Sequence, residues 1–366
     1  MQLDRRYVQY FEWPFAAAIL GMVLVGILTI YSANVFAASA FRKTLFLKQL
    51  TWLGLGTAAM FAACLINPRT LGRYANVIFG LTVLLLLAVF ILGKTGLGAQ
   101  RWLRIGPMTI QPSEFSKLAL VLFLARYFDD HREELHNPKI MLLPTGVTLG
   151  LALLVLKQPD LGTALLLVFI AITIMLLLGL HWRYLVPVVA GGGVLTPLLW
   201  TFLKDYQRRR ILVYLNPDMD PLGASYHIAQ SKIAVGSGGL LGKGWLAATQ
   251  SQLSFLPLNH TDFIFAVLAE QWGFMGCLVI LVAYFYLITK GYQIAQDSTD
   301  LFVSLVAAGI ASMLAIQILI NMAMVLGMLP VVGIPLPLLS YGGSSLLVTM
   351  LSLGLLLNIR MRRFLY

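Results

Sequence analysis

The stretch YANVIFGLTVLLLLAVFIL, residues 74–92, decides the class of fold because it carries no charged side chain. A helix of about 20 consecutive apolar residues spans the hydrocarbon core of a bilayer. The apolar positions are continuous, whereas the strands of a membrane β-barrel alternate apolar and polar positions. The stretch therefore predicts a transmembrane helix and excludes a lipid-facing β-barrel.

The composition of the whole chain agrees with this reading. Of the 366 residues, 59% are hydrophobic and 11% are charged, against roughly a quarter charged in soluble domains. The mean hydropathy is +0.84. These values exclude a cytosolic enzyme, a secreted disulfide scaffold and a disordered chain. Cys64 and Cys277 both lie inside apolar runs, so no disulfide framework is indicated.

Similar apolar runs divide the chain into about ten predicted transmembrane helices. We expect an all-α polytopic membrane protein with a single membrane domain over residues 1–366, and we expect the first run to be retained rather than cleaved as a signal peptide. The runs cover residues 13–33, 47–66, 74–92, 113–128, 140–157, 160–180, 184–203, 263–289, 301–327 and 340–360.

The arginines at residues 5–6 and 360–363 favour a cytoplasmic location for both termini, because short cytoplasmic segments are rich in arginine and lysine. Two unusual segments then lie outside the cytoplasm. Residues 94–112 contain a Gly-Pro turn between short β-prone runs and predict a small hairpin. Residues 204–262, between the seventh and eighth helices, are too long to be only a connector.

The charge balance of 26 basic against 15 acidic residues gives a net charge of +11. In a soluble domain this balance would suggest nucleic acid. Here the basic residues lie mainly in loops and at the ends, so anionic membrane lipid or a phosphorylated lipid-borne ligand is the expected partner.

The run Arg208-Arg209-Arg210 follows the seventh predicted helix. It can be explained as an interfacial anchor, or as a clamp for a diphosphate, because the guanidinium fork fits phosphate oxygens. Arg101, Arg104, Lys232 and Lys243 could join such a clamp. Residues 236–239, Gly-Ser-Gly-Gly, could cradle phosphate with backbone N–H groups, although a tight turn is the better interpretation.

Glu114, Lys117 and Asp160 are among the few ionisable residues in or at the edge of predicted spans, where a charge is costly. Glu114 and Lys117 are three residues apart and share a helical face, so they form either a structural ion pair or a polar floor for a substrate. Asp160 begins the sixth predicted helix, and capping of that helix is the favoured interpretation over a ligand contact.

Asp262 gives the sharpest signal for chemistry, because it ends the long external segment and opens a very apolar helix. Helix capping would explain a carboxylate there. A general base for a reaction at the edge of the membrane would also stand there. His260 suits an orienting role better than a metal site, since no second histidine or cysteine stands at ligand spacing.

Several motifs in order along the chain resemble those of the SEDS family (shape, elongation, division and sporulation proteins). They are Gln100-Arg101-Trp102, residues 111–114 (QPSE), residues 158–163 (QPDLGT), residues 236–240 (GSGGL), residues 260–266 (HTDFIFA) and residues 340–345 (SYGGSS). Residues 251–257 (SQLSFLP) and 329–335 (LPVVGIP) resemble the RodA-like elongation branch more than the division branch.

The resemblance implies a peptidoglycan glycosyltransferase of the bacterial inner membrane that polymerises lipid II on the extracytoplasmic side. It implies Asp262 as the essential aspartate, and as partners a class B penicillin-binding protein with transpeptidase activity and other membrane proteins of the elongation complex. The candidate substrate-binding residues are Arg101, Glu114, Lys117, Asp160, Arg208, Arg210, Lys232, His260 and Ser344. This chain has Leu258 and Gln271 where the family usually has acids.

The residue types in the sequence also agree with this reaction when they are considered apart from the resemblance. Displacing an α-linked diphosphate to form a β-linked glycan in one inverting step needs one base and positive charge on the leaving group. No cofactor is firmly indicated; a divalent cation (Mg²⁺ or Mn²⁺) could share the diphosphate charge, but the sequence shows no dedicated metal site. A flippase or transporter of the same lipid is the main alternative, and a non-catalytic scaffold is a third.

Overall fold

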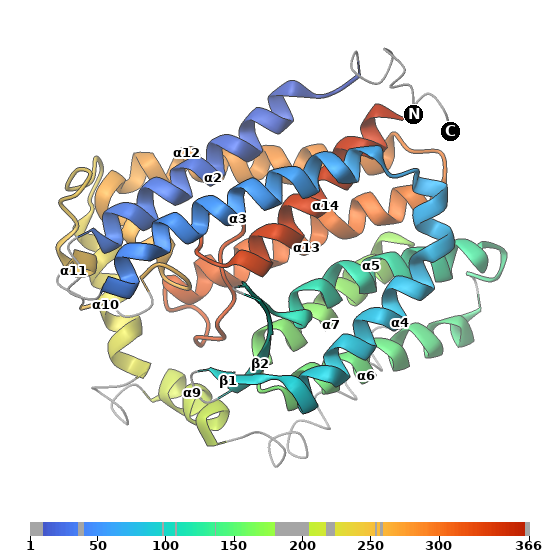
Figure 1. Ribbon diagram of the computed structural model, residues 1–366, viewed down its shortest axis with the longest axis horizontal. Helices are drawn as coiled ribbons and strands as arrows, with labels where there is room; N and C mark the ends of the chain where they lie inside the picture. The colour runs from blue at the N-terminus through green and yellow to red at the C-terminus, as the bar shows by residue number, and fades with distance from the viewer. Residues whose placement is uncertain are drawn as a thin grey trace. The chain divides into compact units, whose positions relative to one another are not determined.

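The computed structural model describes residues 10–35, 40–96, 99–106, 108–135, 137–179, 205–216, 224–252, 255–256 and 259–362. Long helices make up most of this part of the chain (Figure 1). Six of the described helices are long and apolar enough to cross a membrane: α2 (Trp13–Asn34), α4 (Pro68–Leu92), the stretch Lys139–Lys157, α12 (Ile264–Gln296), α13 (Leu301–Val325) and α14 (Gly343–Met361).

The predicted all-α polytopic class is therefore confirmed. The remaining predicted spans within the described residues correspond to α3 (Ala40–Leu65), α5 (Pro112–Asp130) and α7 (Leu161–Leu177), and Lys139–Lys157 comprises a 3-10 turn, Pro138–Met141, followed by α6 (Leu142–Lys157). The predicted seventh span, 184–203, lies outside the described residues, so a total of ten stays a prediction.

Helix ends differ from the apolar runs where local chemistry extends the helix. α4 begins at Pro68 instead of residue 74, because the Asn67 side chain accepts a hydrogen bond from the backbone N–H of Arg69 at 3.0 Å and proline fits the first helical position. α12 continues to Gln296 instead of 289, and the Tyr292 hydroxyl on its last turns lies 2.9 Å from the Ser312 hydroxyl of α13.

The hairpin predicted in residues 94–112 is confirmed and extended by one strand. β2 (Ala99–Ile105) pairs antiparallel with β3 (Met108–Ile110), and β1 (Lys94–Gly96) pairs antiparallel with the other edge of β2. Gly106, in the turn between β2 and β3, has φ +61°, a conformation that glycine adopts without a steric penalty.

The long segment 204–262 contains helices of its own. They are α9 (Asp205–Leu215), α10 (Ala224–Ser237) and α11 (Thr249–Gln252). α10 and α11 lie at one end of α2, α3 and α12 (Figure 1). The sequence predicted that this segment was more than a connector, but its helices are too short and too polar to give a strong apolar pattern.

Contacts divide the chain into two compact units. The first comprises Met1–Cys64, Arg210–Lys290 and Gln317–Met361, and the second comprises Leu65–Arg209, Gly291–Ile316 and Arg362–Tyr366. We describe each unit by itself. A single membrane domain stays a prediction.

In the first unit, α2 makes a close backbone contact with the loop before α14. A side-chain carbon on Gly26 of α2 would lie 2.7 Å from the backbone of Leu339, so only glycine permits this approach. The Asn358 amide of α14 donates to the carbonyl of Ala63 in α3 at 2.6 Å. In the second unit, α4, α5, α6 and α7 pack together and β2 packs on α4.

α12 is interrupted at Gly273, which has φ +63° and ψ −162°. Backbone groups of residues 239–244 complete the hydrogen bonding around the break. Gly239 O and Leu240 O accept from Phe274 N at 2.9 Å and Met275 N at 3.1 Å, and Lys243 N and Gly244 N donate to Glu270 O at 2.9 Å and Gln271 O at 3.0 Å. The glycine-rich stretch that sequence reasoning weighed as a phosphate cradle thus has a structural role against α12.

Candidate active site

The segment 260–262 lies directly before α12, and three donors from α13 and the region before α14 hold its backbone. Each of its three carbonyl groups accepts a hydrogen bond, so the path of this segment is fixed. The bonds run from Asn321 Nδ2 to Asp262 O at 3.0 Å, from Ser340 Oγ to Thr261 O at 2.6 Å, and from Tyr341 N to His260 O at 2.8 Å.

Asn321 also donates to the carbonyl of Ile334 at 2.7 Å, so one buried amide joins α13, the Asp262 segment and the loop before α14. Sequence reasoning did not single out Asn321 as a site residue. The signal was present, because Asn321 is a polar residue inside the apolar run 301–327, and a buried amide needs hydrogen-bond partners.

The carboxylate of Asp262 and the guanidinium of Arg210 approach the same point from different elements. A side-chain carbon on Gly333, which has φ +76°, would lie 3.7 Å from Asp262 Oδ2 and 4.0 Å from Arg210 Nη1. Arg210 Nη1 also donates to the carbonyl of Val331 at 3.0 Å. The structure therefore places an acid and a cation within 4.0 Å of one point beside the Gly333 backbone.

His260 sits beside Asp262 in an arrangement that suits an orienting role. Its Nδ1 lies 3.2 Å from Asn259 Oδ1, and its ring makes an edge contact with Tyr341 at 5.9 Å between centroids. Burial raises the pKa of the Tyr341 phenol above its ordinary value, so this hydroxyl stays protonated at neutral pH.

Two other predicted site residues lie in the first unit. Lys232, on α10, has Nζ 2.7 Å from the position of a side-chain carbon on Gly327, just after α13. The neighbouring Ser231 hydroxyl donates to the carbonyl of Val325 at 2.7 Å, which fixes α10 on the end of α13. Ser344 is buried in the first turn of α14.

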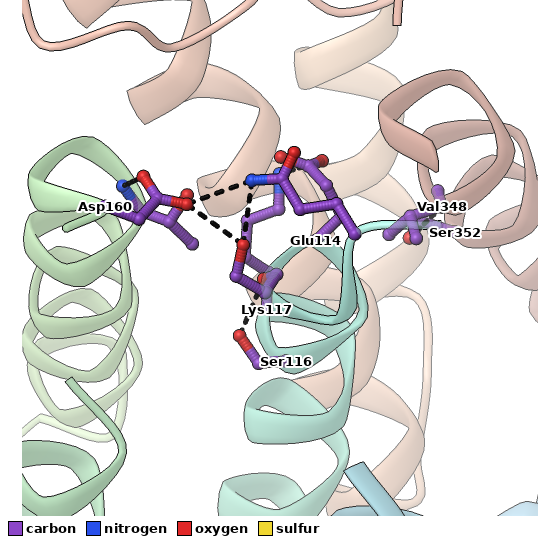
Figure 2. Close-up of polar contacts among 9 residues, drawn as sticks. Glu114, Ser116, Lys117, Asp160, Val348 and Ser352 are labelled. Carbon is purple, nitrogen blue, oxygen red and sulfur yellow. Dashed lines mark hydrogen bonds and ion pairs between the residues drawn. The ribbon is translucent and has the colours of Figure 1, made fainter. Parts of the chain in front are cut away.

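Glu114 and Lys117 form a buried ion pair in the second unit (Figure 2). Lys117 Nζ lies 2.7 Å from Glu114 Oε2, and the two residues are 2% and 4% exposed. The sequence-based expectation that these residues pair and face the interior is confirmed. Such a pair avoids the cost of an isolated charge in lipid.

Asp160 connects α7 to the start of α5 (Figure 2). Its Oδ1 accepts from the backbone N–H of Thr163 at 3.2 Å, which confirms the predicted helix cap. Its Oδ2 accepts from Gln111 Nε2 and from Ser113 Oγ, both at 3.0 Å. Three donors thus stabilise a carboxylate that is 2% exposed.

Arg101 lies on β2, and its guanidinium binds the turn between α6 and α7. Its Nε donates to the carbonyl of Gln158 at 3.0 Å, and its Nη2 donates to the carbonyl of Pro159. Arg101 therefore fixes the small sheet next to Asp160. Arg208 is half-buried on the part of α9 that belongs to the second unit.

The described residues contain no group of three or more histidine, cysteine, aspartate or glutamate side chains that could hold a metal ion. Leu258 lies outside the described residues. Gln271, at the other position where the chain lacks an expected acid, donates from Nε2 to the Ser32 hydroxyl of α2 at 2.6 Å.

Comparison with known proteins identifies close relatives. The chain is 44% identical over 321 residues to peptidoglycan glycosyltransferase MrdB of Escherichia coli K12, with 86% of this chain and 85% of that protein covered. It is 37% identical over 347 residues to stage V sporulation protein E of Bacillus subtilis, with coverages of 92% and 93%.

Solved structures agree with these sequence relatives. A chain from a peptidoglycan synthase complex that coordinates polymerization and crosslinking matches with a TM-score of 0.79 and 32% identity, covering 97% of this chain and 98% of that chain. Rod shape determining protein RodA of Thermus thermophilus matches with a TM-score of 0.70 and 30% identity, with the same coverages.

The family model for FtsW, RodA and SpoVE, described as cell cycle proteins, matches residues 13–364. This match includes both compact units, α2 to α14 and the Asp262 segment. The chain is a multi-pass inner-membrane protein and belongs to the FtsW, RodA and SpoVE family of cell cycle proteins.

Proposed function

We propose that this chain is a peptidoglycan glycosyltransferase that polymerises lipid II into β-1,4-linked glycan strands for cell-wall elongation. The observation that carries the proposal is that the Asp262 carboxylate and the Arg210 guanidinium both lie within 4.0 Å of the same point beside Gly333. The names of the relatives, which include peptidoglycan glycosyltransferases, support the reaction class.

Asp262 is the general base of a single inverting displacement. Its carboxylate takes the proton of the acceptor hydroxyl as that oxygen forms a bond to the anomeric carbon of the donor sugar. The bond between that carbon and the diphosphate oxygen breaks, and the lipid diphosphate leaves with the electron pair. The backbone bonds to residues 260–262 support this role, because they hold the base in one position.

Cationic side chains bind the departing diphosphate. Arg210 Nη1 lies within 4.0 Å of a point beside Gly333 that Asp262 also approaches. The proposal adds Lys232 and Arg208, because guanidinium and ammonium groups neutralise phosphate oxygens in a transition state. His260 orients the acceptor, and Ser344 contacts the substrate. For the second unit, taken by itself, substrate contacts of Arg101, Glu114, Lys117 and Asp160 stay predictions from the family resemblance.

The proposal places both termini in the cytoplasm and Asp262 on the extracytoplasmic side, where lipid II carries its sugar. A class B penicillin-binding protein is the proposed transpeptidase partner, together with other membrane proteins of the elongation complex. The similarity to a chain of a peptidoglycan synthase complex supports an assembly in which polymerization and crosslinking are coordinated.

The direct test is to incubate the purified chain with lipid II in detergent and to separate the products on a gel. We expect a ladder of glycan chains. A parallel measurement in liposomes scores the movement of fluorescent lipid II between leaflets. Lipid movement without any glycan product would reject the proposal in favour of the transporter alternative.

A further inference from the structure

The loop Gly238–Trp245 presents a strongly apolar outer surface although its backbone is bound to α12. Leu240 and Leu241 are 67% and 77% exposed, and Trp245 is 48% exposed. On α12, beside the break to which this loop is bonded, Trp272, Phe274 and Met275 are exposed as well. Exposed apolar residues of both elements thus gather around the backbone bonds at the break, and we call this set of residues the loop–helix surface.

The position of this surface along the membrane normal follows from charges at the opposite end of α12. Lys290, near the end of α12, lies 3.6 Å from Glu12, and Arg360 of α14 lies 2.8 Å from the same carboxylate oxygen. A cluster of charges that is partly exposed marks a boundary between hydrocarbon and water.

The next charges along α12 belong to Glu270, whose Oε1 lies 2.7 Å from Lys243 Nζ in the loop. From Lys290 to the break at Gly273 a helical rise of 1.5 Å per residue gives about 26 Å, close to the roughly 30 Å thickness of the hydrocarbon core of a bilayer, and Glu270 lies three residues beyond the break. The Lys243–Glu270 pair therefore lies at the opposite boundary.

α2 gives an independent estimate of the position of the loop along the membrane normal. From Glu12, just before α2, to Tyr31 the helical rise gives about 28 Å. The ring of Tyr31 stacks on that of Trp245, with 6.3 Å between centroids. Tyrosine and tryptophan concentrate at membrane interfaces. Two helices thus place Trp245 at one level, and Leu240 and Leu241 belong to the same short loop.

We propose that the loop Gly238–Trp245 inserts into the outer leaflet, so that lipid acyl chains cover Leu240 and Leu241 while Lys243 and Trp245 lie at the headgroup level. The loop is bonded to α12 on both sides of the break at Gly273. Its insertion therefore holds the first part of α12, and the Asp262 segment before it, at a fixed height above the lipid.

This height suits a lipid-linked substrate, and that consequence depends on the function proposed above. Asp262 lies eight residues before Glu270, which at the helical rise corresponds to about 12 Å beyond the hydrocarbon boundary. Headgroups occupy roughly 5–7 Å of that distance. A diphosphate in the headgroup layer would then hold its first sugar at the level of the Asp262 carboxylate.

The test measures whether lipid or water surrounds the loop, and it does not depend on enzymatic activity. Leu241→Cys and Leu240→Cys variants of the full chain carry a nitroxide label in nanodiscs of phosphatidylethanolamine and phosphatidylglycerol, with one chain per disc. A high collision rate of the nitroxide with oxygen indicates that the label lies in hydrocarbon. A high collision rate with a water-soluble nickel chelate indicates that it lies in water. Val282→Cys, 60% exposed on α12, is the lipid control, and Glu133→Cys, in the exposed turn Arg132–Glu134, is the water control.

We expect the oxygen-to-nickel collision ratio at both loop positions to fall near that of Val282→Cys and several-fold above that of Glu133→Cys. The wild-type chain is treated with the label to measure any signal from the buried Cys64 and Cys277. A ratio near the water control would overturn the proposal. Low collision rates with both reagents would also overturn it, because they would mean that protein covers the loop. Either result would leave the chemistry of Asp262 standing.

Discussion

At the residue scale, the candidate site combines a fixed backbone with opposite charges. Asn321 and Ser340 hold the carbonyl groups of Asp262 and Thr261, and Arg210 Nη1 and Asp262 Oδ2 lie within 4.0 Å of the same point beside Gly333. In the proposed mechanism, this fixed backbone limits the rearrangement that Asp262 needs before it accepts a proton.

The first prediction concerns Arg210. Reversal of its charge in Arg210→Glu should reduce lipid II polymerisation by about tenfold or more. The introduced carboxylate is negatively charged, as the diphosphate is, and so repels the leaving group instead of stabilising it. Lys139→Glu, on an exposed position of the turn before α6, is the control and should retain activity. Wild-type turnover by Arg210→Glu, measured by glycan gel, would assign Arg210 to anchoring only.

The second prediction concerns the ion pair of α5. Glu114→Gln removes one partner of a buried pair, a change that typically costs about 3–5 kcal/mol. Asp130→Asn removes one partner of the exposed Arg126–Asp130 pair, at 2.6 Å in the same helix, for which about 0–1 kcal/mol is typical. Thermal unfolding in detergent should show the larger loss for Glu114→Gln. Equal unfolding temperatures would contradict a structural contribution from the Glu114–Lys117 pair.

Some residue-level contacts could be predicted and others could not. The spacing of Glu114 and Lys117 determines their pairing, because residues three apart share a helical face. The contact of Asn321 with Asp262 could not be predicted, since it joins segments far apart in the sequence. The contacts of Arg101 could not be predicted either, because its guanidinium donates to the carbonyl groups of Gln158 and Pro159, far away in the sequence.

At the element scale, the break in α12 is the feature that sequence patterns did not reveal. Residues 263–289 form an apolar run that predicts one continuous helix. The interruption at Gly273 depends on backbone partners supplied by residues 239–244, and periodicity within one run carries no information about such partners. Within the described residues, the apolar runs predicted the other spans as helices, because continuous apolar sequence in lipid permits only helix.

The third prediction tests the contact between the loop and α12. A side-chain carbon on Gly238 would lie 2.0 Å from the carbonyl oxygen of Ala269, so Gly238→Ala should destabilise the chain by about 1–3 kcal/mol. Gly236→Ala, two residues earlier in α10, meets nothing within 4 Å and should be neutral or slightly stabilising. Thermal unfolding of the two variants should show a lower unfolding temperature for Gly238→Ala than for Gly236→Ala. Equal unfolding temperatures would contradict the close backbone contact between Gly238 and Ala269.

At the scale of the whole molecule, hydrophobic composition and motif order together predicted more than either did alone. Composition predicted a polytopic helical protein and gave no reaction. The ordered motifs predicted the family, and the match over residues 13–364 confirms it. The division into two compact units was not predicted, because no change of composition marks the boundaries between them.

The measurement that tests the central claim most directly is lipid II polymerisation by purified Asp262→Asn, with thermal stability measured on the same sample. Asparagine keeps the shape and a side-chain oxygen but cannot accept the proton. We predict wild-type unfolding temperature and a polymerisation rate lower by about 10²–10⁴-fold. Asp262→Glu, which retains a carboxylate, should keep more activity than Asp262→Asn. Polymerisation near the wild-type rate by a folded Asp262→Asn variant would contradict the claim that Asp262 is the catalytic base.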